Sequence, residues 1–245
     1  MMSLVRPDVI KIDHSVIQHP ESDNAVAVID AVHTEAIRTG AVIVANGIET
    51  PAHLRTAIAM GATLGQGWLF GQPGPLPAAA QPASTVFPQL LEPAAIAPTP
   101  FEAVRGALRS SPIRRGPLVE LSLDMEVRAR TMAGPTVVLA AFQHVDRFDP
   151  ATRDRYESLA GHSALAAVFA RGMPAEPAKG LRGFDLAAAD PMTGEWTVIV
   201  IGNRETEGLF ARQRHGHSDR YDVYATADRD LVLGAARSLI DRMTR

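Results

Sequence analysis

Three polar side chains, Asp13, Asn46 and Glu49, follow short apolar stretches that are typical of parallel strands. In a parallel sheet, functional groups gather at the carboxyl ends of the strands. Carboxylates placed there can hold the metal ions that activate a water molecule near neutral pH. Such chemistry needs several carboxylates, and three strands supply too few of them. The pattern therefore predicts an incomplete catalytic end.

A histidine pair in the second half of the chain is a weaker candidate. His215 and His217 could bind a metal ion through two imidazoles, with only Asp219 nearby as a third ligand. Two or three ligands on a glycine-bearing loop do not make a closed metal site. We expect a solvated loop here and no metal.

Two further features of the second half allow two interpretations each. His144, Asp146 and Asp149 follow a predicted core strand and could line a pocket, but a turn that caps the next helix accounts for them equally well. Trp196 could stack on a ligand, but its place at the head of an apolar strand favours core packing. We expect no catalytic residue in this half.

The elements of the first segment alternate between strand and helix. In the predicted strand at 9–13, Lys11 and Asp13 share one face, because successive side chains point to opposite sides. The pattern predicts further strands at 41–45 and 64–70, a helix over 24–39 ended by Gly40, and a helix from Pro51 to Gly61 capped by Thr50. This β-α-β-α-β order is typical of a parallel sheet.

A bridge rich in proline and alanine divides the chain. Prolines recur from residue 73 to residue 100, and proline cannot donate a backbone hydrogen bond. We interpret the bridge as an extended linker, and the alternative is a loop packed on the first domain. The predicted boundaries are 1–78 for the first domain, 79–98 for the linker and 99–245 for the second domain.

The second domain begins with its own helix signal, because Thr99, Pro100 and Glu102 form a capping box. The stretch at 118–132 alternates like a strand and also repeats like a helix, and we assign it as a helix. The other predicted elements are strands at 136–142, 196–201 and 221–225 and helices at 153–171 and from 230 to the end. This mixture predicts an α+β domain.

Three runs of the first segment carry a family resemblance: RPDVIKID at 6–13, VIVANGIET at 42–50 and GQGWLFGQP at 65–73. In order and spacing they resemble the last three strand segments of an EAL domain, the barrel phosphodiesterase that hydrolyses cyclic di-GMP. The resemblance implies an α/β fold made of the last three βα units of such a barrel. The family's Glu-Ala-Leu signature and paired-Asp motif, which supply metal ligands, have no place in this chain.

The resemblance also implies roles for single residues. Lys11 matches the family's lysine near the attacking water, Glu49 matches the second glutamate of its Ala-Glu-Gly-Val-Glu run, and Gln66 matches a glutamine of its last strand. Asn46 replaces the first glutamate of that run, which the family uses at its metal-water centre. An amide cannot take a proton from water. We therefore interpret Lys11, Glu49 and Gln66 as vestigial, and expect no catalysis, metal or cofactor. As relics, Lys11 and Glu49 could form an ion pair or face water, and Gln66 could satisfy a backbone group.

The second domain resembles a DICT domain, a sensory module of cyclic-dinucleotide enzymes and two-component proteins. The matching runs are VLAAFQ at 138–143, Tyr156 with Leu159 and Ala160, EWTVIV at 195–200, DRYDVY at 219–224 and DRDLV at 228–232. The resemblance implies a sensor or interaction module that could receive a small-molecule signal. None of these runs indicates a reaction.

Composition excludes several other functions. The chain has 245 residues, a net charge of −3 and no cysteine, so we expect no nucleic-acid partner, disulfide or thiolate metal site. It has no long apolar run at its start, so we expect no membrane span and a cytoplasmic location. A half barrel leaves open sheet edges, which predicts a protein partner or self-association.

Two functional hypotheses follow. The first is a bacterial signal-transduction protein in which a non-catalytic EAL remnant is joined to a DICT-type sensory domain. The second is a cyclic di-GMP phosphodiesterase seen incompletely, either as an N-terminally truncated chain, with Met1 not the true start, or because a separate chain completes the barrel. That enzyme would use Mg²⁺ or Mn²⁺ and release linear pGpG.

Overall fold

The computed structural model describes residues 2–75 and 95–244, which belong to two compact units. Most of the predicted linker at 79–98, up to residue 94, lies outside the described residues. Across the two described ranges, no helix has both the length and the apolar character needed to cross a membrane.

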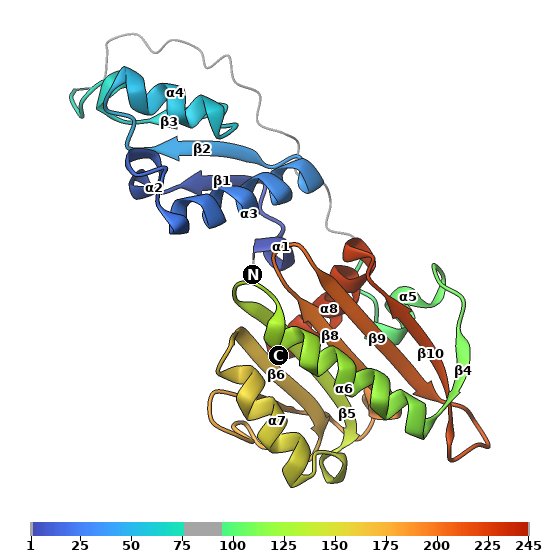
Figure 1. Cartoon of the computed structure of the whole chain (residues 1–245). Coiled ribbons are helices and arrows are strands. Elements are labelled where there is room, and N and C mark those ends of the chain that lie inside the picture. The colour runs from blue at the N-terminus through green and yellow to red at the C-terminus, as the bar shows by residue number, and fades with distance from the viewer. Residues whose placement is uncertain (1, 76–94, 245) are drawn as a thin grey trace. The chain divides into compact units, whose positions relative to one another are not determined.

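The first unit is built on a parallel sheet of three strands in the order β1-β2-β3 (Figure 1). Its elements are α1 (Met2–Val5), β1 (Val9–Ile12), α2 (His14–Gln18), α3 (Asp23–Thr39), β2 (Val42–Asn46), α4 (Pro51–Ala59), β3 (Leu64–Gln66) and a 3₁₀ turn, η1 (Trp68–Phe70). The strands pair in register, with Val9 opposite Val42 and Val44 opposite Leu64. The predicted strand-helix alternation is therefore confirmed.

Local capping signals explain where these helices begin and end. The Ser22 side chain accepts a hydrogen bond from the Ala25 N–H at the start of α3. The helix ends at Gly40, whose φ of +73° suits glycine, because a side chain would be strained there. Thr50 caps α4 with Pro51 at its first position, as predicted.

The third predicted strand, at 64–70, is wrong in its second half. The strand ends at Gln66, and Trp68–Phe70 forms a 3₁₀ turn instead. The Ile48 N–H donates to the Gln66 carbonyl at 3.0 Å, and the Ile48 carbonyl accepts from the Leu69 N–H at 3.0 Å. A side chain at Gly67 would collide with the Ile48 backbone. The backbone after Gln66 therefore packs on the loop that follows β2, which ends the ladder.

The second unit contains a sheet of seven strands in the order β4-β10-β9-β8-β5-β6-β7. The pairs β5-β6 and β6-β7 are parallel and the other pairs are antiparallel. The strands are β4 (Ser111–Arg114), β5 (Thr136–His144), β6 (Ser163–Arg171), β7 (Arg182–Asp185), β8 (Glu195–Ile201), β9 (Thr206–Gln213) and β10 (Arg220–Thr226).

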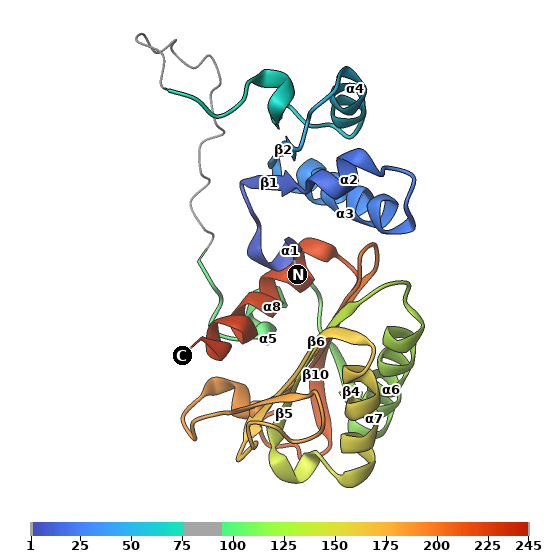
Figure 2. The same cartoon turned by 90° about the vertical axis from the view of Figure 1, so that its left-hand side faces the viewer.

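Helices cover both faces of this sheet (Figure 2). Helices α6 (Arg115–Thr131) and α7 (Pro150–Ala160) lie on one face, and α5 (Pro100–Arg105) and α8 (Arg229–Met243) lie on the other. The short turn η2 (Val145–Arg147) leads from β5 to α7, and η3 (Pro191–Gly194) lies between β7 and β8. Because both faces are covered, β5 is buried from Thr136 to Phe142, which explains its continuous apolar sequence.

One predicted helix, at 153–171, is wrong. Helix α7 ends at Ala160, and 163–171 forms the core strand β6, which pairs in parallel with β5. The alanine-rich sequence favours a helix locally. In the fold, however, β5, α7 and β6 form a βαβ unit, and the residues after Gly161 are needed as its second strand. Tertiary pairing therefore overrides the local preference.

The other predicted elements are confirmed in type. They include α5 with its Thr99 cap, α6 in the ambiguous stretch at 118–132, and the strands β5, β8 and β10. The first unit is thus a partial β/α barrel, and the second is a separate α+β domain.

Candidate functional site

The carboxyl ends of β1, β2 and β3 bring three of the four family-matched residues together. Asn46 and Gln66 are register partners on β2 and β3. The Lys11 Nζ atom, on β1, donates a hydrogen bond of 2.9 Å to Gln66 Oε1 on β3. The lysine therefore reaches across the central strand, and its ammonium is engaged with an amide oxygen.

Glu49 lies in the loop that follows β2. Its backbone N–H donates to His53 Nδ1 at 3.3 Å, while its carboxylate makes no ion pair or hydrogen bond within the described ranges. Glu49, Asn46 and Gln66 line a broad hollow of about 580 Å³ together with His14. Gln72 lines it as well, so the hollow offers three amides, an imidazole and one carboxylate.

Asp13 does not take part in this hollow. Its carboxylate accepts hydrogen bonds from the Ser15 N–H at 2.9 Å and from the Ser15 hydroxyl at 2.7 Å, which caps α2. These hydrogen bonds, the backbone one foremost, lower the pKa of Asp13. No group of three or more potential metal ligands occurs in the two described ranges. The strand ends can therefore hydrogen-bond a polar molecule, but their donor set is poor in carboxylates.

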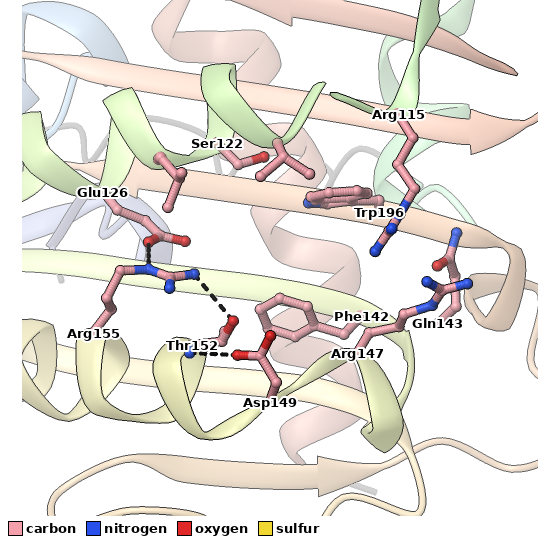
Figure 3. Close-up of a pocket in the computed structure, with 12 residues that line it drawn as sticks. Arg115, Ser122, Glu126, Phe142, Gln143, Arg147, Asp149, Thr152, Arg155 and Trp196 are labelled. Carbon is pink, nitrogen blue, oxygen red and sulfur yellow. Dashed lines mark hydrogen bonds and ion pairs between the residues drawn. The ribbon is translucent and has the colours of Figure 1, made fainter. Parts of the chain in front are cut away.

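A second hollow lies in the second unit, between α6 and α7 and beside the carboxyl end of β5 (Figure 3). It has a volume of about 190 Å³. Its lining residues come from α6, β5, η2, α7 and β8: Arg115, Val119, Ser122, Leu123, Glu126, Phe142, Gln143, Arg147, Asp149, Thr152, Arg155 and Trp196. We call this hollow the α6/α7 pocket.

One side of the α6/α7 pocket is an internally satisfied polar network. Arg155 Nε donates to the buried Glu126 carboxylate at 2.8 Å, and Arg155 Nη2 donates to Thr152 Oγ1 at 3.0 Å. The Thr152 N–H donates to Asp149 Oδ1 at 2.7 Å, and this hydrogen bond lowers the pKa of Asp149. Both carboxylates in the pocket therefore already have partners.

The opposite end of the pocket carries two other arginines. Figure 3 shows the guanidinium groups of Arg115 and Arg147 near Gln143 and Trp196. Neither guanidinium makes an ion pair or hydrogen bond with another described residue. Arg115 begins α6, where the partial positive charge of the helix dipole disfavours a cation. This end is therefore an exposed positive site.

Aromatic side chains form the apolar wall of the pocket. Phe142 is 8% exposed, and its ring lies 5.4 Å from that of Phe148 and 5.6 Å from that of Tyr156. Trp196 meets Tyr221 edge-on at 6.2 Å. The Tyr156 hydroxyl is buried and has no hydrogen-bond partner within the described ranges. Burial, and the nearby Glu126 charge, raise the pKa of Tyr156 well above its usual value.

The residues of the second unit that were candidates from the sequence lie in a turn, in the pocket lining or in an exposed loop. His144 and Asp146 form the predicted turn, in which the Asp146 N–H donates to His144 Nδ1 at 3.3 Å. Asp149 caps α7 and also lines the pocket, so both interpretations apply to it. The same holds for Trp196, which packs in the core and lines the pocket.

The histidine pair, His215 and His217, lies in an exposed turn with Asp219. These residues belong to no cluster of metal ligands within the described ranges. The sequence reasoning did not identify Arg115, Arg147, Glu126 and Arg155 as pocket residues.

Away from the pocket, an ion-pair network around the buried Glu195 joins α5 to the sheet. Arg212, on β9, donates at 2.6 Å to Glu195 Oε1 and at 2.6 Å to Glu102 Oε1. Its guanidinium lies 4.3 Å from the centre of the Phe101 ring. Burial raises the pKa of Glu195, whereas the hydrogen bond from Arg212 lowers the pKa of Glu102.

Comparison with known proteins gives two domain matches. Residues 2–73 match the EAL domain, and residues 103–214 match the family described as a sensory domain in diguanylate cyclases and two-component systems, DICT. No significant match was found among curated proteins.

Among solved structures, the crystal structure of polyphosphate kinase from Porphyromonas gingivalis is similar at 12% identity and a TM-score of 0.36. The alignment covers 98% of this chain and 46% of that protein, so the chain spans less than half of its length. A likeness this weak carries no argument about fold or function.

The two domain matches show that the chain joins an EAL domain segment, residues 2–73, to a DICT sensory domain, residues 103–214. This pair of domains indicates signal transduction linked to cyclic di-GMP.

Proposed function

We propose that the chain is a non-catalytic signal-transduction protein, in which the DICT unit receives a small-molecule signal and the EAL segment serves as an interaction part. The observation that carries this proposal is the state of the strand ends in the EAL segment. An amide stands at position 46, and Lys11 is hydrogen-bonded to Gln66 at 2.9 Å.

The chemistry of phosphodiester hydrolysis supports the non-catalytic assignment. The attacking water must lose a proton, and metal ions held by several carboxylates normally assist that loss. Asn46 cannot accept the proton, and Glu49 is the one carboxylate that lines the hollow. The Lys11 ammonium is a donor only, and it already faces an amide oxygen. These groups suit binding better than catalysis.

The α6/α7 pocket supports the sensory role of the DICT unit. It combines an aromatic wall with two arginines that have no partner among the described residues. Small-molecule sites are commonly hollows with mostly apolar walls and a few polar groups that orient the ligand. In this pocket, Val119, Leu123, Phe142 and Trp196 form an apolar wall, and Arg115 and Arg147 are available to orient a ligand.

Unpaired strand edges support the interaction role of the EAL segment. Among the described residues, β1 and β3 each pair with β2 alone, so each presents one open edge. Open edges favour pairing with another strand. Trp68 and Phe70, which are 63% and 58% exposed, lie directly after β3. Another protein, or a second copy of this chain, would cover these groups.

The non-catalytic assignment is tested by incubating the complete natural protein with cyclic di-GMP and Mg²⁺ or Mn²⁺. Chromatography should detect no linear pGpG. An active EAL phosphodiesterase, measured in parallel, serves as the positive control for the assay. Release of pGpG that is lost in the Lys11→Met and Glu49→Gln variants would refute the proposal, because it would place hydrolysis at these strand ends.

The open edges also favour a second candidate function. Further strands, from a longer chain or another chain, could complete the barrel and supply the missing carboxylates. Under this alternative, Asn46→Glu in the complete protein should raise pGpG release. An unchanged rate in that variant would count against it.

The sensory role is tested separately by a thermal-shift screen of neutral, cationic and anionic small molecules on the complete protein. At least one class should raise the melting temperature of the DICT unit, because a ligand that binds the folded state stabilises it. A screen in which no class does so would refute the sensory role.

A further inference from the structure

We propose that the α6/α7 pocket binds a small, flat, apolar molecule that carries a single carboxylate. This inference rests on the proposed sensory role of the DICT unit and specifies the chemistry of its ligand. It follows from the charges, the aromatic wall and the size of the pocket, taken in turn.

The charges of the pocket favour one negative charge on the ligand. Three guanidinium groups and two carboxylates line it, which leaves one net positive charge. Glu126 and Arg155 neutralise each other at 2.8 Å, and Asp149 is held by the start of α7. The excess charge therefore lies at the end formed by Arg115 and Arg147.

The chemistry of these two arginines favours a carboxylate. A guanidinium presents a planar fork of N–H donors that fits the two oxygens of a carboxylate or phosphate. A phosphate dianion would bring a second negative charge close to Asp149, whose lowered pKa keeps it ionised at neutral pH. A monoanion meets the arginines without that repulsion.

The wall of the pocket favours a flat apolar body. Phe142 and Trp196 line it with Val119 and Leu123, and these side chains present almost no hydrogen-bonding groups. Aromatic rings prefer offset or edge-on contact with other rings. An aromatic or similarly flat ring system would therefore bind between α6 and the aromatic wall, with its carboxylate toward Arg115 and Arg147.

The size of the pocket limits the ligand. Its volume of about 190 Å³ is below the range of about 300–1,000 Å³ that is typical for drug-sized ligands. One ring or two fused rings would fit this space, whereas a cyclic dinucleotide would exceed it. The inferred ligand is thus distinct from the substrate of EAL phosphodiesterases.

The test uses three probes of one shape and isothermal titration calorimetry of the complete protein: 2-naphthoate, neutral 2-naphthamide and 2-naphthyl phosphate. We expect naphthoate to bind, and the amide to bind roughly tenfold or more weakly, because it lacks the charge that the arginines recognise. Naphthyl phosphate should also bind more weakly than naphthoate.

Variants locate the binding. Arg115→Gln and Arg147→Gln should each weaken naphthoate binding roughly tenfold, and the effect on the amide should be small. Arg153→Gln is the matched control. Arg153 lies on α7 at 51% side-chain exposure, outside the pocket, so its loss should leave naphthoate affinity unchanged. Circular dichroism of each variant verifies that it is folded.

Several results would overturn the inference. These are amide binding as tight as naphthoate binding, tighter binding of the phosphate, or no binding of any probe by folded protein. An equal loss of affinity in the Arg153→Gln control would do so as well. If the thermal-shift screen finds a neutral or cationic ligand instead, the carboxylate inference fails while the sensory role stands. If no class of molecule shifts the melting, the sensory role itself fails.

Discussion

Replacing Arg212 by leucine should destabilise the DICT unit strongly, because the buried Glu195 loses its cationic partner and keeps hydrogen bonds such as the one from the Phe101 N–H at 3.2 Å. The Glu195 side chain is fully buried, and Arg212 donates to it at 2.6 Å. The same guanidinium holds Glu102 at 2.6 Å and lies 4.3 Å from the centre of the Phe101 ring. Leucine keeps an apolar side chain as far as Cδ but lacks the guanidinium, so all three interactions are removed.

The magnitude follows from the burial of Glu195. Breaking a buried ion pair by removing one partner typically costs about 3–5 kcal/mol. The contact with Phe101 adds about 0.5–1 kcal/mol, since Arg212 is partly exposed. A typical domain has a stability of about 5–15 kcal/mol, so the variant should lose roughly a third or more of it. With a urea m-value of about 2 kcal/mol/M, the midpoint should fall by roughly 2 M.

The loss should also depend on pH, and both carboxylates act in the same direction. The folded-state pKa of Glu195 is raised by burial, so protonation favours folding and its ionised form is costly above that pKa. Removing Arg212 raises this pKa further. The pKa of Glu102 is lowered by Arg212, so its stabilisation exists above the unfolded-state pKa and disappears as the pH falls. The difference between variant and native protein should therefore shrink from pH 7 toward about pH 4.

Urea unfolding followed by the fluorescence of Trp196, next to Glu195 in sequence, measures this effect. The chain has two tryptophans, and Trp68→Phe in every sample leaves Trp196 as the reporter of the second unit. Adding Glu195→Gln to Arg212→Leu should recover part of the loss, because the buried charge is then gone. A loss below about 1 kcal/mol, an equal loss at both pH values, or no recovery in the double variant would refute the reasoning.

Three further predictions concern the same unit. Gly183→Ala should cost more than about 3 kcal/mol in thermal melts, because its Cβ would collide with the Pro174 carbonyl, whereas the control Gly194→Ala has open space and should stay within about 1 kcal/mol. Tyr156→Phe should leave the free energy of unfolding in urea unchanged or raise it by about 1 kcal/mol, because it removes a buried hydroxyl that lacks a partner among the described residues. A decrease above about 1 kcal/mol would instead reveal a hydrogen bond made by this hydroxyl. Asp149→Ala should lower the free energy of unfolding by about 1 kcal/mol at pH 7, because it removes the cap of α7. This difference in stability should vanish as the pH falls through the lowered pKa of Asp149. A difference that persists in acid would contradict the capping role.

Much of the fold could be predicted because its signals are local. Thr50 with Pro51, and Thr99 with Pro100, mark helix starts through side-chain hydrogen bonds that span three residues. The strand at 136–142 can be recognised in the sequence because both of its faces are buried, which gives a continuous apolar run. Such features depend on near neighbours in sequence, so no knowledge of the tertiary fold is needed to find them.

The misassigned and missed elements depend on distant partners. Strand β6 is rich in alanine, and its extended form is fixed by pairing with β5 and β7. Strand β9, for which no prediction was made, contains Gly208, where a side chain would crowd Phe210 and Val232. A glycine in a strand weakens the local pattern, although the fold requires it there.

The candidate sites divide in the same way. Asn46, Glu49 and Gln66 could be found because they lie in motifs that resemble a known family. The α6/α7 pocket could not, because Arg115 and Arg147 come from different elements and meet only after α6 packs across the sheet. Asp149 and Trp196, which also line the pocket, could be named as candidates from the sequence, because each lies next to a predicted core strand.

Strand β5 has an unusual position, because it is the strand at which the sheet changes direction. It runs parallel to β6 and antiparallel to β8. Inserting or deleting one residue in β5 would shift its side chains to the opposite face and break the register on both sides at once. Related sequences should therefore keep the length of β5 constant and place their insertions in the connecting loops, such as the exposed turn at 214–219 between β9 and β10.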